Sequence, residues 1–186
     1  MTADAERRLS SRWPVEARPG WRIGRLAFAG EAAINIEPAV RHQIATTGAD
    51  VVVIQAGGND VAAAVFPREP LREETIARAA RAVIAIGEDA RRAGVSRVIV
   101  LTLVPPIDLE LWKRALMGSK QIDDQTWEIA SKALAEGMEV LDANRLFRDA
   151  GGKLRREYRS DGVHWSLAGY RVLNAALWSQ VQSCVH

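Results

Sequence analysis

Hydrophobic residues gather along this chain in short, nearly continuous runs that are rich in Val, Ile and Leu. Three such runs stand out, at residues 51–54, 98–101 and 138–141, and each follows a turn or cap signal that contains glycine. Runs of this length and composition are typical of parallel strands that are covered on both faces. The pattern therefore predicts three buried parallel strands.

The segments around these runs show the spacing of helices. Over residues 71–90, apolar positions recur every three or four residues, and the stretch ends in two arginines and a glycine at 91–94. Cations in a last turn and a glycine at the stop favour the end of a helix. Residues 123–135 and 167–182 predict two further helices, the second of which opens after Ser166 as its N-cap.

Strands that alternate with helices indicate βαβ units and a parallel sheet between two helical layers. The N-terminal part fits this scheme less well. Residues 5–13 and 37–47 have helical character and residues 15–17 favour a short strand, but no strong strand precedes the helix at 37–47. Since such a sheet normally begins with a strand, the first central strand is missing from the pattern.

Composition narrows the class of protein. The 186 residues, 48% hydrophobic and 26% charged, fit one globular domain and exclude collagen-like, disordered and disulfide-rich chains. Lys and Arg number 25 against 23 Asp and Glu, and their spread along the chain argues against a nucleic-acid partner. The single cysteine, Cys184, forms no intramolecular disulfide, and no Cys/His spacing for structural zinc is present.

No stretch of 18 apolar residues predicts a membrane span, and residues 1–12 carry charges where a signal peptide needs an apolar region. As written, the chain is expected to be cytoplasmic.

The first segment that could do chemistry is Gln55-Ala56-Gly57-Gly58-Asn59-Asp60, directly after the strand at 51–54. This position lies at the carboxyl edge of the sheet, where α/β folds bind their ligands. The two glycines allow a tight turn that delivers the Asn59 amide to a cleft. The alternative is an ordinary turn in which Asn59 or Asp60 caps a helix.

The second segment is Asp161-Gly162-Val163-His164, just before the C-terminal helix. An Asp three residues before a His can accept a hydrogen bond from imidazole Nδ1 and leave Nε2 facing a cleft as a base. The alternative is a turn aspartate with a helix-capping histidine. His42 lies in a polar helix and His186 is terminal, so neither competes as the base.

Together and in this order, the GGND and DGVH segments resemble the SGNH or GDSL hydrolase family, from about residue 2 to the C-terminal helix. The resemblance implies a flavodoxin-like three-layer α/β/α fold and a serine esterase or acyl hydrolase that uses no metal and no cofactor. It implies Asn59 and an earlier glycine as oxyanion donors, His164 as base and Asp161 as its orienting acid. Gly20 is the expected glycine, although Gly24 and Gly30 lie nearby. The implied substrate is a small ester or an acylated carbohydrate.

The sequence departs from the family at the nucleophile. The family's serine lies in a Gly-Asp-Ser block after the first central strand, and this chain contains neither. Ser10 and Ser11 lie within helix-like sequence and are poor substitutes, whereas residues 1–9 resemble the segment that follows the block. We therefore expect a single domain, 1–186, that is N-terminally incomplete and inactive as written, with a homodimer formed through the incomplete sheet as one consequence. The alternative is that the protein itself has lost the Gly-Asp-Ser block and is a non-catalytic ligand-binding protein.

Aromatic residues supply candidate pocket walls. Trp21, Trp112, Trp127 and Trp165 could each line a pocket or pack in the core, and only Trp165, beside His164, favours the pocket. Residues 107–121 follow Pro105-Pro106 and form either a lid or a plain surface connection.

Overall fold

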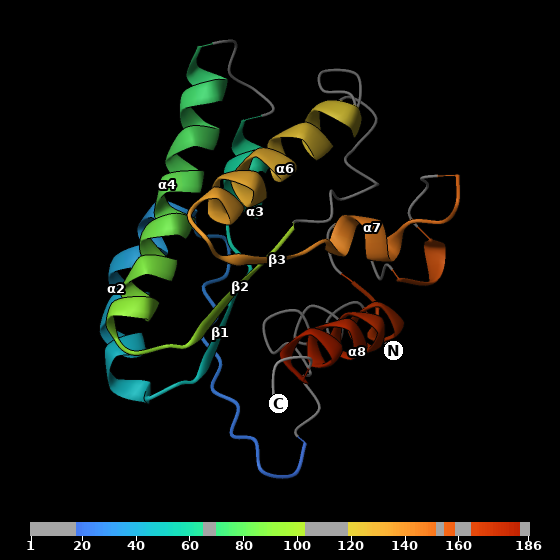
Figure 1. The fold of residues 1–186 in the computed structure, drawn as a ribbon. Coiled ribbons are helices and arrows are strands. Elements are labelled where there is room, and N and C mark those ends of the chain that lie inside the picture. The colour runs from blue at the N-terminus through green and yellow to red at the C-terminus, as the bar shows by residue number, and fades with distance from the viewer. Residues whose placement is uncertain (1–17, 65–69, 103–118, 152–154, 159–164, 183–186) are drawn as a thin grey trace.

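The computed structural model describes residues 18–64, 70–102, 119–151, 155–158 and 165–182 (Figure 1). The strands are β1 (Val51–Ile54), β2 (Arg97–Leu101) and β3 (Glu139–Leu141), which confirms the three predicted runs. The helices are α2 (Ala33–Thr47), α3 (Gly58–Ala63), α4 (Leu71–Arg92), α6 (Ser119–Ala135), α7 (Ala143–Phe147) and α8 (Leu167–Gln182), with a 3-10 turn, η1, at Arg156–Tyr158.

The described strands form one parallel sheet in the order β1-β2-β3. Val51 pairs with Arg97 and Ile99 pairs with Glu139, so the three strands end close together at one edge. The helices α3 and α4 connect β1 to β2, and α6 connects β2 to β3, as the alternating pattern predicts. The carboxyl edge of the sheet thus carries the segments that follow Ile54, Leu101 and Leu141.

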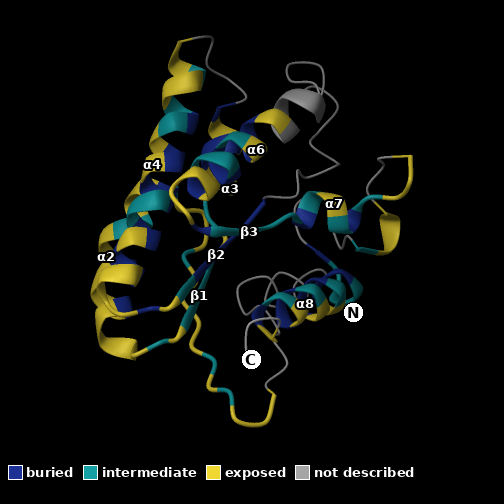
Figure 2. Cartoon of the chain, in the orientation of Figure 1, coloured by how far each residue is buried: buried dark blue, intermediate teal, exposed yellow. Residues whose placement is uncertain are grey.

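Side chains on the two faces of the sheet enter two different cores. Val98 and Val100 pack with α2, α4 and α6, whereas Ile99 and Leu101 pack with α7 and α8. This alternation follows from the two-residue period of a strand. Figure 1 shows α8 on the opposite side of the sheet from α2, α4 and α6, and Figure 2 shows buried positions on the sides that face the sheet. The result is the expected three-layer α/β/α arrangement.

Two helices begin four residues earlier than predicted, α2 at Ala33 and α6 at Ser119. For α2 the reason is a cap from outside the helix, because the Asp60 carboxylate accepts a hydrogen bond of 2.8 Å from the Ala33 N–H. A carboxylate at this end also complements the helix dipole. α8 matches its predicted bounds, and Ser166 caps it, as its Oγ accepts from the Gly169 N–H at 3.2 Å.

Residues 18–32, ahead of α2, contain no strand. Trp21 and Ile23 nevertheless pack beside Val51 and Val53 in the α8 core. Val51, Val52 and Val53 are only partly buried, whereas β2 is buried over 98–101. Among the described residues, β1 is hydrogen-bonded to β2 alone, so its outer edge lies beside no described strand. No helix within the described ranges is long and apolar enough to cross a bilayer.

Candidate active site

The turn after β1 places the predicted GGND segment at the carboxyl edge. Gly57 has φ +96°, a left-handed conformation that suits glycine, and its carbonyl accepts the first α3 hydrogen bond, from Val61 N–H at 3.0 Å. Asn59 therefore lies in the first turn of a short helix, with an exposed side chain.

Asn59 is held by a contact that is distant in sequence. Its Nδ2 donates a hydrogen bond of 2.8 Å to the Glu31 carbonyl, in the turn just after Gly30. Gly30 has φ +77° and lies where the chain enters α2. A primary amide carries two N–H donors, and only one is used here among the described residues. Within the part of the chain that the structure describes, the second donor has no partner.

Asp60 has a structural role, which the sequence analysis raised as the alternative for this motif. Its side chain is 5% exposed and its carboxylate accepts from the Ala33 N–H, so it caps α2. The helix it caps is distant in sequence, a relation that local patterns do not reveal. The Asp60 and Asn59 contacts together hold the 30–33 turn against the start of α3.

Gly20 lies elsewhere, next to the C-terminal end of α8. The flanking Arg18 donates to Gln182 Oε1 at 3.0 Å and lies over the Trp178 ring, and Trp21 meets Trp178 edge-on at 5.1 Å. This end of α8 adjoins the start of β2, at the amino edge of the sheet. The structure brings Asn59 together with the turn at Gly30. The assignment of Gly20 as an oxyanion donor stays a prediction.

A polar cluster that the sequence analysis missed lies at the ends of β2 and β3. Thr102 Oγ1 donates to Asp142 Oδ1 at 3.1 Å and accepts from the Asn144 N–H at 3.1 Å. Asp142 also caps α7 through Arg145 N–H at 3.0 Å. The sequence signal for this cluster is a polar residue directly after each predicted strand, Thr102 after 98–101 and Asp142 after 138–141. The cluster links the ends of β2 and β3, and the buried Asn144 Oδ1 has no hydrogen-bond partner among the described residues.

The predicted base and acid, His164 and Asp161, lie outside the described residues, as do Ser10 and Ser11, so these assignments stay predictions. The described flanks of the DGVH segment are held together. Ser166 N–H donates to the Tyr158 carbonyl at 2.9 Å, and a Cβ on Gly169 would lie 2.6 Å from the same oxygen.

The described tryptophans differ in how far they are buried. Trp165 is 8% exposed and packs on Phe147 and Tyr170, with ring centroids 5.0 and 5.5 Å away, so it belongs to the core beside α8. Trp21 is partly buried at the amino edge, and Trp127 is exposed on α6. Trp112 and most of the 107–121 segment lie outside the described residues.

Burial raises the pKa of Tyr170 to about 12, so this phenol keeps its proton at neutral pH. Within the described ranges, no group of three or more His, Cys, Asp or Glu side chains is placed to hold a metal ion.

Comparison with solved structures gives the same fold. A GDSL-like lipase from Bacteroides thetaiotaomicron VPI-5482 is 21% identical, with 84% of this chain and 73% of that chain covered at a TM-score of 0.64. An acetyl xylan esterase, AlAXEase, is 18% identical over 84% and 79%, with a TM-score of 0.61. The acetylxylan esterase Axe2 from Geobacillus stearothermophilus is 18% identical over 82% and 68%, with a TM-score of 0.56. No curated protein matches the chain.

The sequence itself matches the model of the GDSL-like Lipase/Acylhydrolase family over residues 2–172. That match spans most of the 186 residues and includes both motifs on which the resemblance was based. Sequence and fold therefore agree, and the chain belongs to the GDSL-like lipase/acylhydrolase family.

Proposed function

We propose that this protein is an acyl hydrolase domain for a small ester or O-acyl group, with Asn59 as an oxyanion donor and His164 as the general base. The observation that carries the proposal is the Asn59 side chain, held to the Glu31 carbonyl at the carboxyl edge with one amide N–H unused among the described residues. A donor fixed in advance at this edge suits a tetrahedral oxyanion, and one such donor is typically worth about 3–4 kcal/mol of barrier.

Gly30 is the proposed second donor, in place of Gly20. It precedes the residue whose carbonyl holds Asn59, and its positive φ lets the backbone turn sharply there. Its N–H lies one residue before Glu31, whose carbonyl anchors Asn59. The Asp60 cap on Ala33 supports this arrangement, since it holds the turn from its other side.

The base and acid come from the DGVH segment. His164 would take the proton from the attacking serine hydroxyl and pass it to the leaving alcohol, while Asp161 holds the imidazole tautomer. The described residues on either side of this segment contact each other, because the Ser166 N–H donates to the Tyr158 carbonyl and Ser166 also caps α8.

The serine nucleophile belongs to a Gly-Asp-Ser block that this sequence lacks. The outer edge of β1 supports a place for the strand that would carry it. A parallel strand along that edge would cover the partly exposed Val51, Val52 and Val53 and end beside Asn59. The chain as written is accordingly proposed to be inactive.

Two of the similar structures are acetyl xylan esterases, which favours an O-acyl group on a carbohydrate as the substrate class. The second candidate function is a non-catalytic ligand-binding protein, and the absence of the Gly-Asp-Ser block favours it. In that case the Asn59 edge would bind an acyl or carbohydrate ligand without turnover.

The deciding experiment compares the 186-residue chain with a version preceded by an apolar strand of four to six residues and Gly-Asp-Ser. The chain as written is expected to hydrolyse p-nitrophenyl acetate at background rate and to resist labelling by a serine-directed fluorophosphonate. The extended version should hydrolyse the ester above background and be labelled by the fluorophosphonate. Its His164→Ala variant should lose turnover. A folded extended version without activity would favour the binding protein, and labelling of Ser10 or Ser11 would identify a different nucleophile.

A further inference from the structure

Glu31 is a charged residue at the turn that anchors Asn59. Its carbonyl accepts the 2.8 Å hydrogen bond from Asn59 Nδ2, and it directly follows Gly30, whose φ is +77°. The Glu31 side chain is exposed, and its Oε2 accepts a hydrogen bond of 2.9 Å from Asn35 Nδ2. One residue thus supplies both the backbone anchor of the Asn59 amide and a negative charge at the same turn.

The start of α2 does not require this carboxylate as a cap. An acidic residue that caps a helix accepts hydrogen bonds from backbone N–H groups of the first turn. At α2 that acceptor is Asp60, which binds the Ala33 N–H at 2.8 Å. Among the described residues, the Glu31 carboxylate accepts from the Asn35 side chain and from no backbone N–H. Capping therefore leaves the charge of Glu31 without a direct role.

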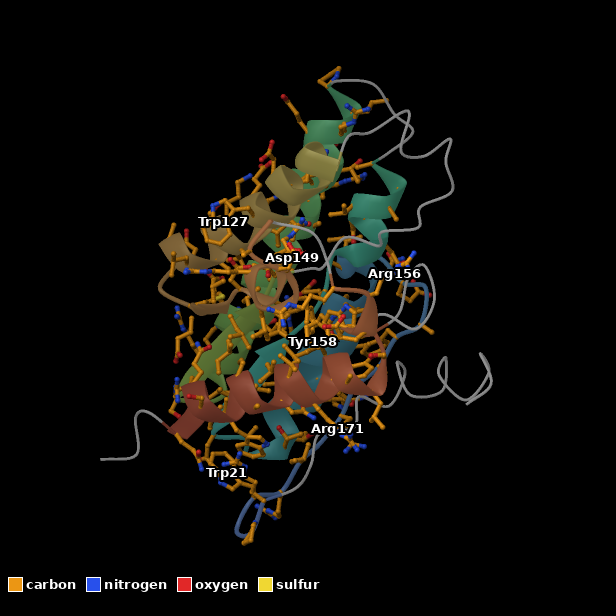
Figure 3. The ribbon with its side chains drawn as sticks, turned by 90° about the vertical axis from the view of Figure 1, so that its right-hand side faces the viewer. Trp21, Trp127, Asp149, Arg156, Tyr158 and Arg171 are labelled. Carbon is orange, nitrogen blue, oxygen red and sulfur yellow. The ribbon has the colours of Figure 1, made fainter. Side chains whose placement is uncertain are left out.

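The charge of Glu31 is not neutralised by an ion pair within the described ranges. The ion pairs there lie on α2 and α4, within α6, and between β2 and β3, and none includes Glu31 or Asp60. Two exposed arginines labelled in Figure 3, Arg156 and Arg171, extend from η1 and α8 and not from this turn. Two carboxylates, at Glu31 and Asp60, therefore accompany the Asn59 amide.

A fixed negative charge at this turn discriminates between substrates by their charge. A tetrahedral oxyanion forms on every ester, so its repulsion by Glu31 is common to all substrates and cancels when two esters are compared. An ester with a further negative charge meets an additional repulsion that a neutral ester does not. For unit charges about 7 Å apart at an effective dielectric constant of about 40, this repulsion corresponds to roughly a five- to tenfold difference in kcat/KM.

We propose that Glu31 is a specificity-determining residue, which makes the Asn59 site select neutral O-acyl substrates over anionic ones. This inference rests on the proposed function and narrows its substrate class. The favoured substrate is an ester of an uncharged carbohydrate, whereas a sugar with a carboxylate or phosphate group near the acyl group is disfavoured. Asn35 is the positioning residue, because its hydrogen bond holds the Glu31 carboxylate at the turn.

The charge at the site can be measured on the chain as written, without turnover. A cationic and an anionic nitroxide, aminomethyl-PROXYL and carboxy-PROXYL, are compared by their effect on the NMR relaxation of the Gly30 backbone N–H and the Asn59 side-chain N–H, at low ionic strength. The cation should relax both groups more than the anion. Glu31→Gln, which keeps an acceptor oxygen for Asn35, should lower the ratio of the two effects by roughly threefold.

Glu136→Gln is the matched control for this measurement. It removes one exposed carboxylate just after α6, next to the start of β3 at the amino edge, and changes the net charge by the same amount. The ratio at Gly30 and Asn59 should stay unchanged in this variant. Equal relaxation by the two nitroxides in wild-type, an unchanged ratio in Glu31→Gln, or the same change in both variants overturns the proposal.

The version that carries Gly-Asp-Ser tests the selectivity itself. Its substrates are p-nitrophenyl butyrate and the p-nitrophenyl monoester of succinic acid, whose acyl groups have the same chain length and differ by one carboxylate. Glu31→Gln should lower the ratio of kcat/KM for the neutral ester to kcat/KM for the anionic ester roughly five- to tenfold, and Glu136→Gln should not. An active version whose ratio does not respond to Glu31→Gln overturns this inference alone. A version without activity on either ester overturns the proposed function, and the selectivity with it.

Discussion

The two edges of the sheet use their polar groups in different ways. At the amino edge, Arg97 bonds to Glu139 through Nε at 2.6 Å and to the carbonyls of Gln180 and Val181 at 3.1 and 2.8 Å. Glu139 also accepts from the Gln180 amide at 2.9 Å. These groups satisfy one another and tie the end of α8 to β2 and β3. Their arrangement contributes to stability.

At the carboxyl edge, polar groups hold loops in place and leave donors unused. The Asp60 carboxylate caps Ala33, whereas its neighbour Asn59 uses one N–H on the Glu31 carbonyl and has no second partner among the described residues. Two adjacent residues of one motif thus have different roles: Asp60 stabilises the turn, and the Asn59 side chain is exposed. Variants at the amino edge and at Asp60 should therefore lower stability, whereas a variant at Asn59 should mainly lower activity.

The largest stability effect is expected for Gly169→Ala at the carboxyl edge. The added Cβ would lie 2.6 Å from the Tyr158 carbonyl oxygen, so backbone must move, at a cost of about 2–3 kcal/mol. The matched control is Gly87→Ala in α4, whose Cβ would meet the flexible end of the Met138 side chain. Because the end of that side chain can rotate, whereas the Tyr158 carbonyl is backbone, the control should lose less. Urea unfolding measures both, and equal losses would contradict this account.

Asp60→Ala is expected to cost about 2 kcal/mol. It removes a buried acceptor and leaves the Ala33 N–H at the start of α2 without its partner. Asp60→Asn, which keeps an acceptor oxygen, is the control and should recover part of the loss. Urea unfolding gives the free energies, and hydrogen exchange at the first turn of α2 should rise in Asp60→Ala. Unchanged exchange there would show that the cap does not hold the helix.

At the amino edge, Arg97 lowers the pKa of Glu139 below its ordinary value of 4.5, mainly through their hydrogen bond. A carboxyl whose pKa is lower in the folded state stabilises the fold above its unfolded pKa, and that contribution disappears as pH falls through the folded pKa. The Glu139 side chain is 36% exposed, so solvent limits the effect to below about 1 kcal/mol. Wild-type should lose this increment below pH 4.5, whereas Glu139→Gln should lack it. Parallel stability curves for the two proteins from pH 6 to 3 would contradict the assignment.

Sequence patterns were sufficient where the decisive interactions are local. The strands at 51–54 and 97–101 follow from continuous β-branched residues, and the end of α4 follows from its last arginines and Gly94. The Ser166 cap is local as well, since its Oγ meets an N–H three residues later.

Contacts between residues distant in sequence determine the features that the sequence patterns did not predict. The start of α2 depends on Asp60, which is 27 residues away, so the prediction began the helix too late. Two of the three candidate glycines have similar conformations, with φ +83° at Gly20 and +77° at Gly30. Only the bond from Asn59 to Glu31, 28 residues apart, distinguishes the turn at Gly30.

The smallest stability effect is expected for Asn59→Ala, one residue from Asp60. Its side chain is exposed and loses a single neutral hydrogen bond, so the free energy of unfolding should fall by no more than about 0.5–1 kcal/mol. If the amide is an oxyanion donor, the same change in a version that carries the serine should lower kcat about 100- to 1000-fold, with KM nearly unchanged. Asp60→Asn in that version should instead lower stability more than kcat, because it perturbs the turn without removing the donor. Urea unfolding and ester hydrolysis on the same samples measure both quantities. An Asn59→Ala variant that loses as much stability as Asp60→Ala, with kcat intact, would make both residues structural and remove the distinction between the two edges of the sheet.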